Sequence, residues 1–165
     1  MGGPHRRPSH CFRLELVILD SKLEGVSAKA LERFVVQAQR AAGVAGEVDV
    51  LITSSAQIRR LNRRFRRQNK VTDVLSFPSA DGGAGDIAIS AEVGARNARR
   101  LGHSVADELK ILILHGLLHL AGYDHESDSG EMAREEARLR FAFGLPTTLI
   151  ERTNGMHGVG KRRSS

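Results

Sequence analysis

The feature that most constrains the fold of this chain is the segment ILILHGLLHL at residues 111–120, which is apolar nearly all the way round a helix. A helix without a polar face has to be covered on several sides, so we expect it in the middle of a domain. Ser104 precedes it with Asp107 three residues later, a pattern typical of a capping box at a helix start. The sequence therefore predicts a central, buried helix over residues 104–120.

Two histidines interrupt this apolar segment, and their spacing indicates a metal site. His115 and His119 are four residues apart, so both imidazoles project from one side of the helix. Gly122 can adopt the left-handed conformation that ends a helix, which returns His125 toward the other two. Three neutral imidazoles suit zinc and leave one coordination position open, as catalytic zinc requires, although nickel and copper also accept them. We predict one zinc ion per chain, bound by His115, His119 and His125.

The histidine spacing alone leaves the reaction open. It matches the ligand spacing of metzincin proteases, but these place a glutamate directly after the first histidine as general base, and Gly116 stands here. Asp124 and Glu126 flank the third histidine. They are candidates for the general base or for partners that orient the imidazoles, and equally for ordinary solvated carboxylates of a turn.

A strongly basic segment at residues 58–70, IRRLNRRFRRQNK, points to a polyanionic partner. It contains no acidic residue, whereas a merely soluble helix more often mixes charges. The net charge of +6 also suits nucleic acid or an anionic membrane surface, and a solvated basic face remains the alternative. With six Phe, one Tyr and no Trp, base stacking is not expected as the main binding mode. The predicted nucleic-acid-binding residues are Arg59, Arg60, Arg63, Arg64 and Arg67.

The pattern of strands and helices predicts an α+β fold: a single compact domain with a mixed four-stranded sheet packed with helices. Alternation and apolar runs predict strands over 12–20, 47–53, 72–77 and 86–90, and helices over 27–42, after Ser54 or Ser55, and over 91–101, 104–120 and 129–143. We expect one domain over 12–151, between a flexible leader at 1–11 and a flexible basic tail at 152–165. The single cysteine and the lack of an apolar run of membrane-spanning length predict a cytoplasmic protein without membrane association.

Four motifs together resemble the YbeY family of bacterial endoribonucleases and ribosomal RNA maturation factors. They are LNRRFR (61–66), TDVLSFP (72–78), GDI (85–87) and HGLLHLAGYDH (115–125), in matching order over about residues 47–143. The resemblance implies an α+β protein that binds one zinc through the three motif histidines. It also implies a single-strand-specific endoribonuclease acting in 3′-end maturation of small-subunit ribosomal RNA and in ribosome quality control. Its partners would be RNA and ribosomal proteins, with no DNA expected.

The resemblance also assigns a functional arginine, which maps onto Arg66. Phe65 stands where the family motif usually has tyrosine, so any role of that hydroxyl is absent here. The predicted catalytic residues are Arg66 and His115: the zinc would polarise a phosphoryl oxygen and activate water, and Arg66 would stabilise the charge that builds on phosphorus. The nucleophile, water or the substrate's 2′-hydroxyl, stays open. Two other functions remain, a metzincin-like metalloprotease and a non-catalytic, zinc-stabilised ribosome assembly factor.

Overall fold

The computed structural model describes residues 16–146, which form one four-stranded sheet and five helices. The sheet order is β1-β2-β4-β3, with β1, β2 and β4 parallel and β3 antiparallel to β4. The predicted α+β fold with a mixed sheet is confirmed. In chain order the elements are β1 (Val17–Leu19), α1 (Ala28–Ala41), β2 (Val48–Thr53), α2 (Ser55–Arg66), β3 (Val74–Pro78), β4 (Gly85–Ser90), α3 (Ala91–Leu101), α4 (Val105–Leu120) and α5 (Glu131–Ala142).

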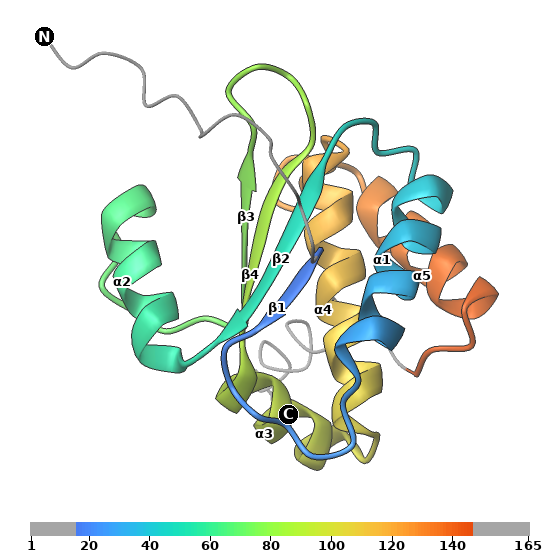
Figure 1. The fold of residues 1–165 in the computed structure, drawn as a ribbon. Helices are drawn as coiled ribbons and strands as arrows, with labels where there is room; N and C mark the ends of the chain where they lie inside the picture. Colours follow the sequence, from blue (N-terminus) through green and yellow to red (C-terminus); the bar gives the residue numbers. More distant parts are fainter. Residues whose placement is uncertain (1–15, 147–165) are drawn as a thin grey trace, which may run out of the picture.

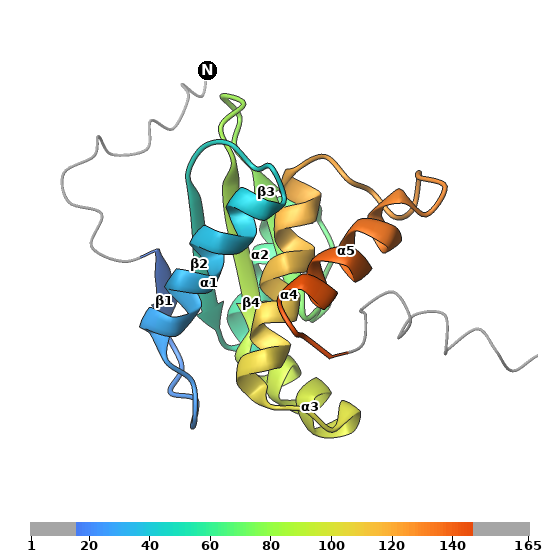
Figure 2. The ribbon, with the colours of Figure 1, turned by 90° about the vertical axis from the view of Figure 1, so that its right-hand side faces the viewer.

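The sheet separates the helices into two unequal layers. Helix α2 lies alone on one side, and α1, α4 and α5 lie on the other, as Figures 1 and 2 show. Helix α4 packs against β3, β4 and the other helices of its layer, while α3 lies near the end of the sheet where α4 begins. The buried face of α2 is small: Ile58 packs on Leu75 and Ala88, and Asn62 is the other buried residue of this helix. The main core lies between the sheet and the α1–α4–α5 layer.

Helix α4 occupies the central position that its apolar sequence predicts. Its residues from Glu108 to Leu118 are buried except Lys110, while His119 and Leu120 are half-buried. Ser104 begins the helix as predicted, since its hydroxyl accepts a hydrogen bond from the Asp107 amide at 3.0 Å. Serines cap α1, α2 and α3 in the same way. The sequence allowed either Ser54 or Ser55 as the N-cap of α2, and in the structure Ser54 is the cap.

The starts of two elements differ from the sequence prediction by two residues. Strand β3 begins at Val74 rather than Thr72; just before it, the Asp73 carboxylate accepts the Val74 amide at 2.8 Å and the Asp73 carbonyl oxygen accepts the Ser90 amide at 2.8 Å. Helix α5 begins at Glu131 rather than Ser129, because Gly130 is in a left-handed conformation with φ of 92°.

Several expectations fall on residues that the structure does not describe. The proposed leader, the tail, and the ends of the 12–151 domain lie outside residues 16–146, and so does the beginning of the strand predicted from residue 12. Within the described range, no helix combines the length and the hydrophobicity needed to cross a bilayer.

Candidate metal centre and nucleic-acid interface

The three predicted metal ligands lie together at the C-terminal end of α4. One ring nitrogen of each of His115, His119 and His125 lies within 4.8 Å of the others, and the Nε2 atoms of His115 and His119 are 3.2 Å apart. Helix α4 supplies the first two ligands from consecutive turns. Gly122, with φ of 98°, reverses the chain after the helix as predicted, so that His125 faces them.

The hydrogen bonds of two rings determine which nitrogen is free to bind a metal. Nδ1 of His119 lies 3.1 Å from the carbonyl oxygen of Tyr123, and a carbonyl only accepts, so this Nδ1 carries the proton. Nδ1 of His115 likewise donates to the Glu136 carboxylate at 3.0 Å. When both rings are neutral, their Nε2 atoms therefore present lone pairs toward each other.

This arrangement of lone pairs fits a metal ion. Two lone pairs at 3.2 Å with no proton between them repel each other, and a shared cation removes the repulsion. Two nitrogens that each lie about 2.0–2.1 Å from a tetrahedral zinc are about 3.3 Å apart. The His115–His119 pair thus has the separation and the protonation that zinc requires.

The proton affinity of His119 is low, which also favours metal binding. The pKa of His119 is lowered from 6.5 to about 4, mainly by burial and then by the neighbouring His115 and His125. At neutral pH its imidazole is therefore uncharged and does not have to lose a proton before it coordinates an ion.

A buried carboxylate behind the first ligand was missed by the sequence analysis. Glu136, on α5, is fully buried and accepts both from His115 and from Nη1 of Arg140, the latter at 3.2 Å. Arg140 is itself 2% exposed and also donates to the carbonyl oxygen of Pro146. The sequence did hold a signal, since Glu136 and Arg140 share the apolar stripe of α5 with Met132 and Leu139.

Gly116 has a structural reason for standing where metzincins have glutamate. A Cβ at this position would lie 2.9–3.1 Å from three side-chain carbons of Ile87 on β4, closer than packed atoms approach. Position 116 therefore faces the sheet, and a glutamate there would have no room. The packing of α4 on β4 therefore leaves no room for a protease-type base at position 116.

The arginine predicted to be catalytic lies on the other side of β3 and is connected to α4 through it. Nη2 of Arg66 donates to the carbonyl oxygen of Ser76 at 3.0 Å. The Ser76 hydroxyl in turn donates to the carbonyl oxygen of Gly116 at 3.2 Å, next to the first ligand. One residue of strand β3 therefore contacts both the arginine helix and the metal-site helix.

The chain is similar to known proteins over most of its length. The family model described as endoribonuclease YbeY matches residues 14–143. The chain belongs to the YbeY family. Among its relatives, endoribonuclease YbeY of Koribacter versatilis is 58% identical over 84% of this chain and 91% of its own length. That of Solibacter usitatus is 51% identical over 74% and 84%.

A solved structure has a similar fold. The solution structure of the Thermotoga maritima protein TM1509 matches with a TM-score of 0.55 and 29% sequence identity, over 88% of this chain and 99% of that protein. The resemblance first seen in four short motifs therefore extends over most of the chain.

Within this YbeY-family site, the Asp124 carboxylate beside His125 is engaged in hydrogen bonds of its own turn. Asp124 accepts hydrogen bonds from the Glu126 amide at 3.1 Å and the Ser127 hydroxyl at 3.0 Å. These bonds hold the pKa of the exposed Asp124 carboxyl below its usual value, which weakens it as a proton acceptor. Asp124 acts here as a turn carboxylate, and Glu126 is exposed in the same turn.

The predicted nucleic-acid-binding arginines all lie exposed on or directly after α2. Arg67 ends the helix in a left-handed conformation with φ of 55°. The exposed set comprises Arg59, Arg60, Arg63, Arg64, Arg66 and Arg67.

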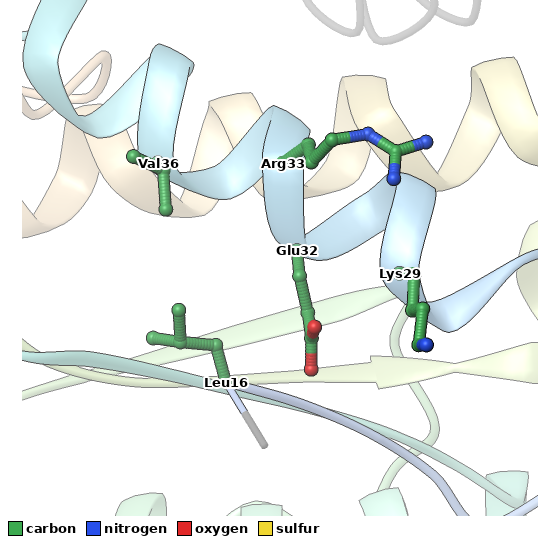
Figure 3. Close-up of a pocket in the computed structure, with 5 residues that line it drawn as sticks. All are labelled: Leu16, Lys29, Glu32, Arg33 and Val36. Carbon is green, nitrogen blue, oxygen red and sulfur yellow. The ribbon is translucent and has the colours of Figure 1, made fainter. Parts of the chain in front are cut away.

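A separate hollow lies between β1 and α1 (Figure 3). Its lining combines apolar and charged side chains, namely Leu16, Lys29, Glu32, Arg33 and Val36. It shares no residue with the histidine cluster, so the metal centre is not part of this hollow.

Proposed function

We propose that this chain is a single-strand-specific, zinc-dependent endoribonuclease that acts in 3′-end maturation of small-subunit ribosomal RNA and in ribosome quality control. The observation that carries the proposal is the pair of Nε2 lone pairs 3.2 Å apart, with both Nδ1 protons held, in a chain of the endoribonuclease YbeY family. Its setting would be the cytoplasm, with ribosomal RNA and ribosomal proteins as partners, and residues 12–151 as the nuclease domain.

Different side chains would bind the metal, stabilise the charge on phosphorus and bind the RNA backbone. His115, His119 and His125 would hold the zinc, and His115, the residue before Gly116, would be the catalytic ligand. A bound zinc would supply a Lewis acid for a phosphodiester oxygen. Arg66 would place its guanidinium against the negative charge that builds on phosphorus, and the arginines of α2 would bind the RNA backbone.

The chemical form of the cleaved RNA end identifies the nucleophile. Attack by water leaves a linear phosphate, whereas attack by the neighbouring 2′-hydroxyl leaves a 2′,3′-cyclic phosphate. Because the Asp124 carboxylate is engaged in its turn, we do not propose it as the general base. End analysis of the cleaved RNA distinguishes the two reactions.

The proposal is tested by cleavage of a single-stranded RNA with protein whose bound metal has been quantified. Wild type should cleave, His115→Ala should lose both metal and activity, and Arg66→Ala should keep the metal and lose most of the activity. Equal activity of the three proteins would indicate a contaminating nuclease. Metal-loaded wild type that binds RNA without cutting it would instead support the assembly-factor function.

The metalloprotease alternative is weakened by the packing of Gly116 against Ile87. Hydrolysis of casein that disappears in His119→Ala would restore it.

A further inference from the structure

We infer that Phe65 is a stacking platform for a nucleobase of single-stranded RNA, an inference that rests on the proposed nuclease function. Phe65 is 58% exposed at the C-terminal end of α2, although a large aromatic side chain gains most from burial. Its neighbours on both sides in the sequence are arginines. An exposed aromatic ring among cations is the combination that proteins use to bind single strands.

The ring of Phe65 packs against a second aromatic ring. It lies 5.3 Å from the ring of Phe77, centroid to centroid, with 56° between the planes. Phe77 is half-buried and packs against the small cluster of Ile58, Leu75 and Ala88 that joins α2 to the sheet. Phe65 is thus an exposed ring that packs against a half-buried aromatic side chain.

Two guanidinium groups lie near these rings. The Cζ of Arg64 is 5.3 Å from the Phe65 centroid, and that of Arg66 is 6.0 Å from the Phe77 centroid. Both distances are within the range of cation–π attraction, which holds the cations close to where a base would stack. Phosphates on either side of a stacked base would then meet positive charge, and residues 58–70 offer no carboxylate to oppose them. This positive charge favours binding of a nucleic acid over binding of an apolar peptide segment.

The platform and the metal centre lie on opposite sides of one strand. Phe77 faces α2, and the preceding residue, Ser76, donates its hydroxyl to Gly116 of α4. Strand β3 is one of the two edge strands of the described sheet. A single strand that stacks one base on Phe65 therefore needs to cross only this edge to bring a phosphodiester toward the histidines. A duplex keeps its bases stacked inside, so this platform also gives a reason for single-strand preference.

The test uses the full-length, zinc-loaded protein and a 2′-O-methyl oligoribonucleotide that carries the fluorescent base 2-aminopurine, with its integrity checked after each titration. Stacking on Phe65 quenches the fluorescence, so we expect quenching by wild type and by Phe65→Trp. For Phe65→Leu we expect loss of quenching and binding weaker by about fivefold to a hundredfold. The slope of log affinity against log salt should be unchanged in Phe65→Leu and reduced in Arg64→Gln.

The matched control is Phe141→Leu, which changes a ring that is 91% exposed on α5, away from the arginines of α2. It should bind like wild type, and the melting temperatures of both leucine variants should stay close to that of wild type. Unchanged quenching and affinity in Phe65→Leu would overturn the inference and leave this ring for a protein partner. Wild type that shows Phe65-dependent quenching but no cleavage of ordinary RNA would support the platform and contradict the nuclease.

Discussion

The substitution Glu136→Gln is the most specific single change to the surroundings of the metal centre. The change conserves size but replaces two acceptor oxygens with one acceptor and one donor. In the native protein Glu136 accepts from two donors, Nδ1 of His115 and Nη1 of Arg140. One amide cannot accept through both of its ends, so one of these two donors has to lose its partner.

The magnitude follows from the burial of this group. Glu136 is fully buried, and a buried donor left without an acceptor costs about 1–3 kcal/mol. If the amide nitrogen faces His115, the ring is driven to carry its proton on Nε2, which removes the lone pair that binds metal. Loss of a carboxylate behind a ligating histidine typically weakens metal binding by about 10- to 100-fold, and we expect Glu136→Gln to fall in this range.

The assay is a competition titration of zinc between the protein and a chromophoric chelator. Glu135→Gln is the matched control, because the neighbouring carboxylate is bound to Arg138 on the outer surface of α5. We expect the control to bind zinc as wild type does. An unchanged zinc affinity in Glu136→Gln, or an equal loss in the two variants, would refute the proposed positioning of His115.

Three further predictions concern packing, acidity and charge. Gly116→Ala should lower the free energy of unfolding by up to about 2 kcal/mol in denaturant titrations, because overpacking against Ile87 costs about 1–3 kcal/mol and exceeds the helix gain of about 1 kcal/mol. Gly94→Ala on α3, whose Cβ would meet Leu109 at 3.4 Å, should be neutral or stabilising, and equal effects of the two changes would contradict this packing argument. The pKa of His119 is lowered from 6.5 to about 4, so below pH 6.5 the unfolded chain takes up this proton more readily than the folded one. The metal-free protein should therefore lose stability as the pH falls from 6.5 to about 4 and then level off, a loss that should shrink in His119→Gln; an identical pH profile in that variant would disprove it. Arg66→Lys keeps the charge but not the planar fork, so kcat for RNA cleavage should drop about a hundredfold with little change in KM, whereas a rise in KM alone would place Arg66 in binding only.

Most of the fold could be predicted because its elements carry strong local signals. The apolar run of α4 required a central position, and Ser104 and Gly122 marked where this helix begins and where the chain turns back. His115 and His119 are four residues apart on one helix, so helical geometry alone brings them together. These inferences needed no knowledge of distant contacts.

The rest of the site depends on contacts between elements far apart in the sequence. Glu136 approaches His115 only because α5 packs on α4, and the charge-rich sequence of α5 offers other carboxylates that point outward. The connection from Arg66 through Ser76 to α4 depends on the pairing of β3 at the edge of the sheet. The scarcity of aromatic residues likewise gave no sign that Phe65 would be left exposed on Phe77.

We propose that RNA cleavage requires one metal ion, held by His115, His119 and His125. Zinc can be added in fractions of an equivalent to metal-free protein while the initial rate of cleavage of single-stranded RNA is measured. The rate should rise from near zero and level off at one equivalent, and His119→Ala should stay inactive throughout. Cleavage by the metal-free protein at the full rate would contradict the claim.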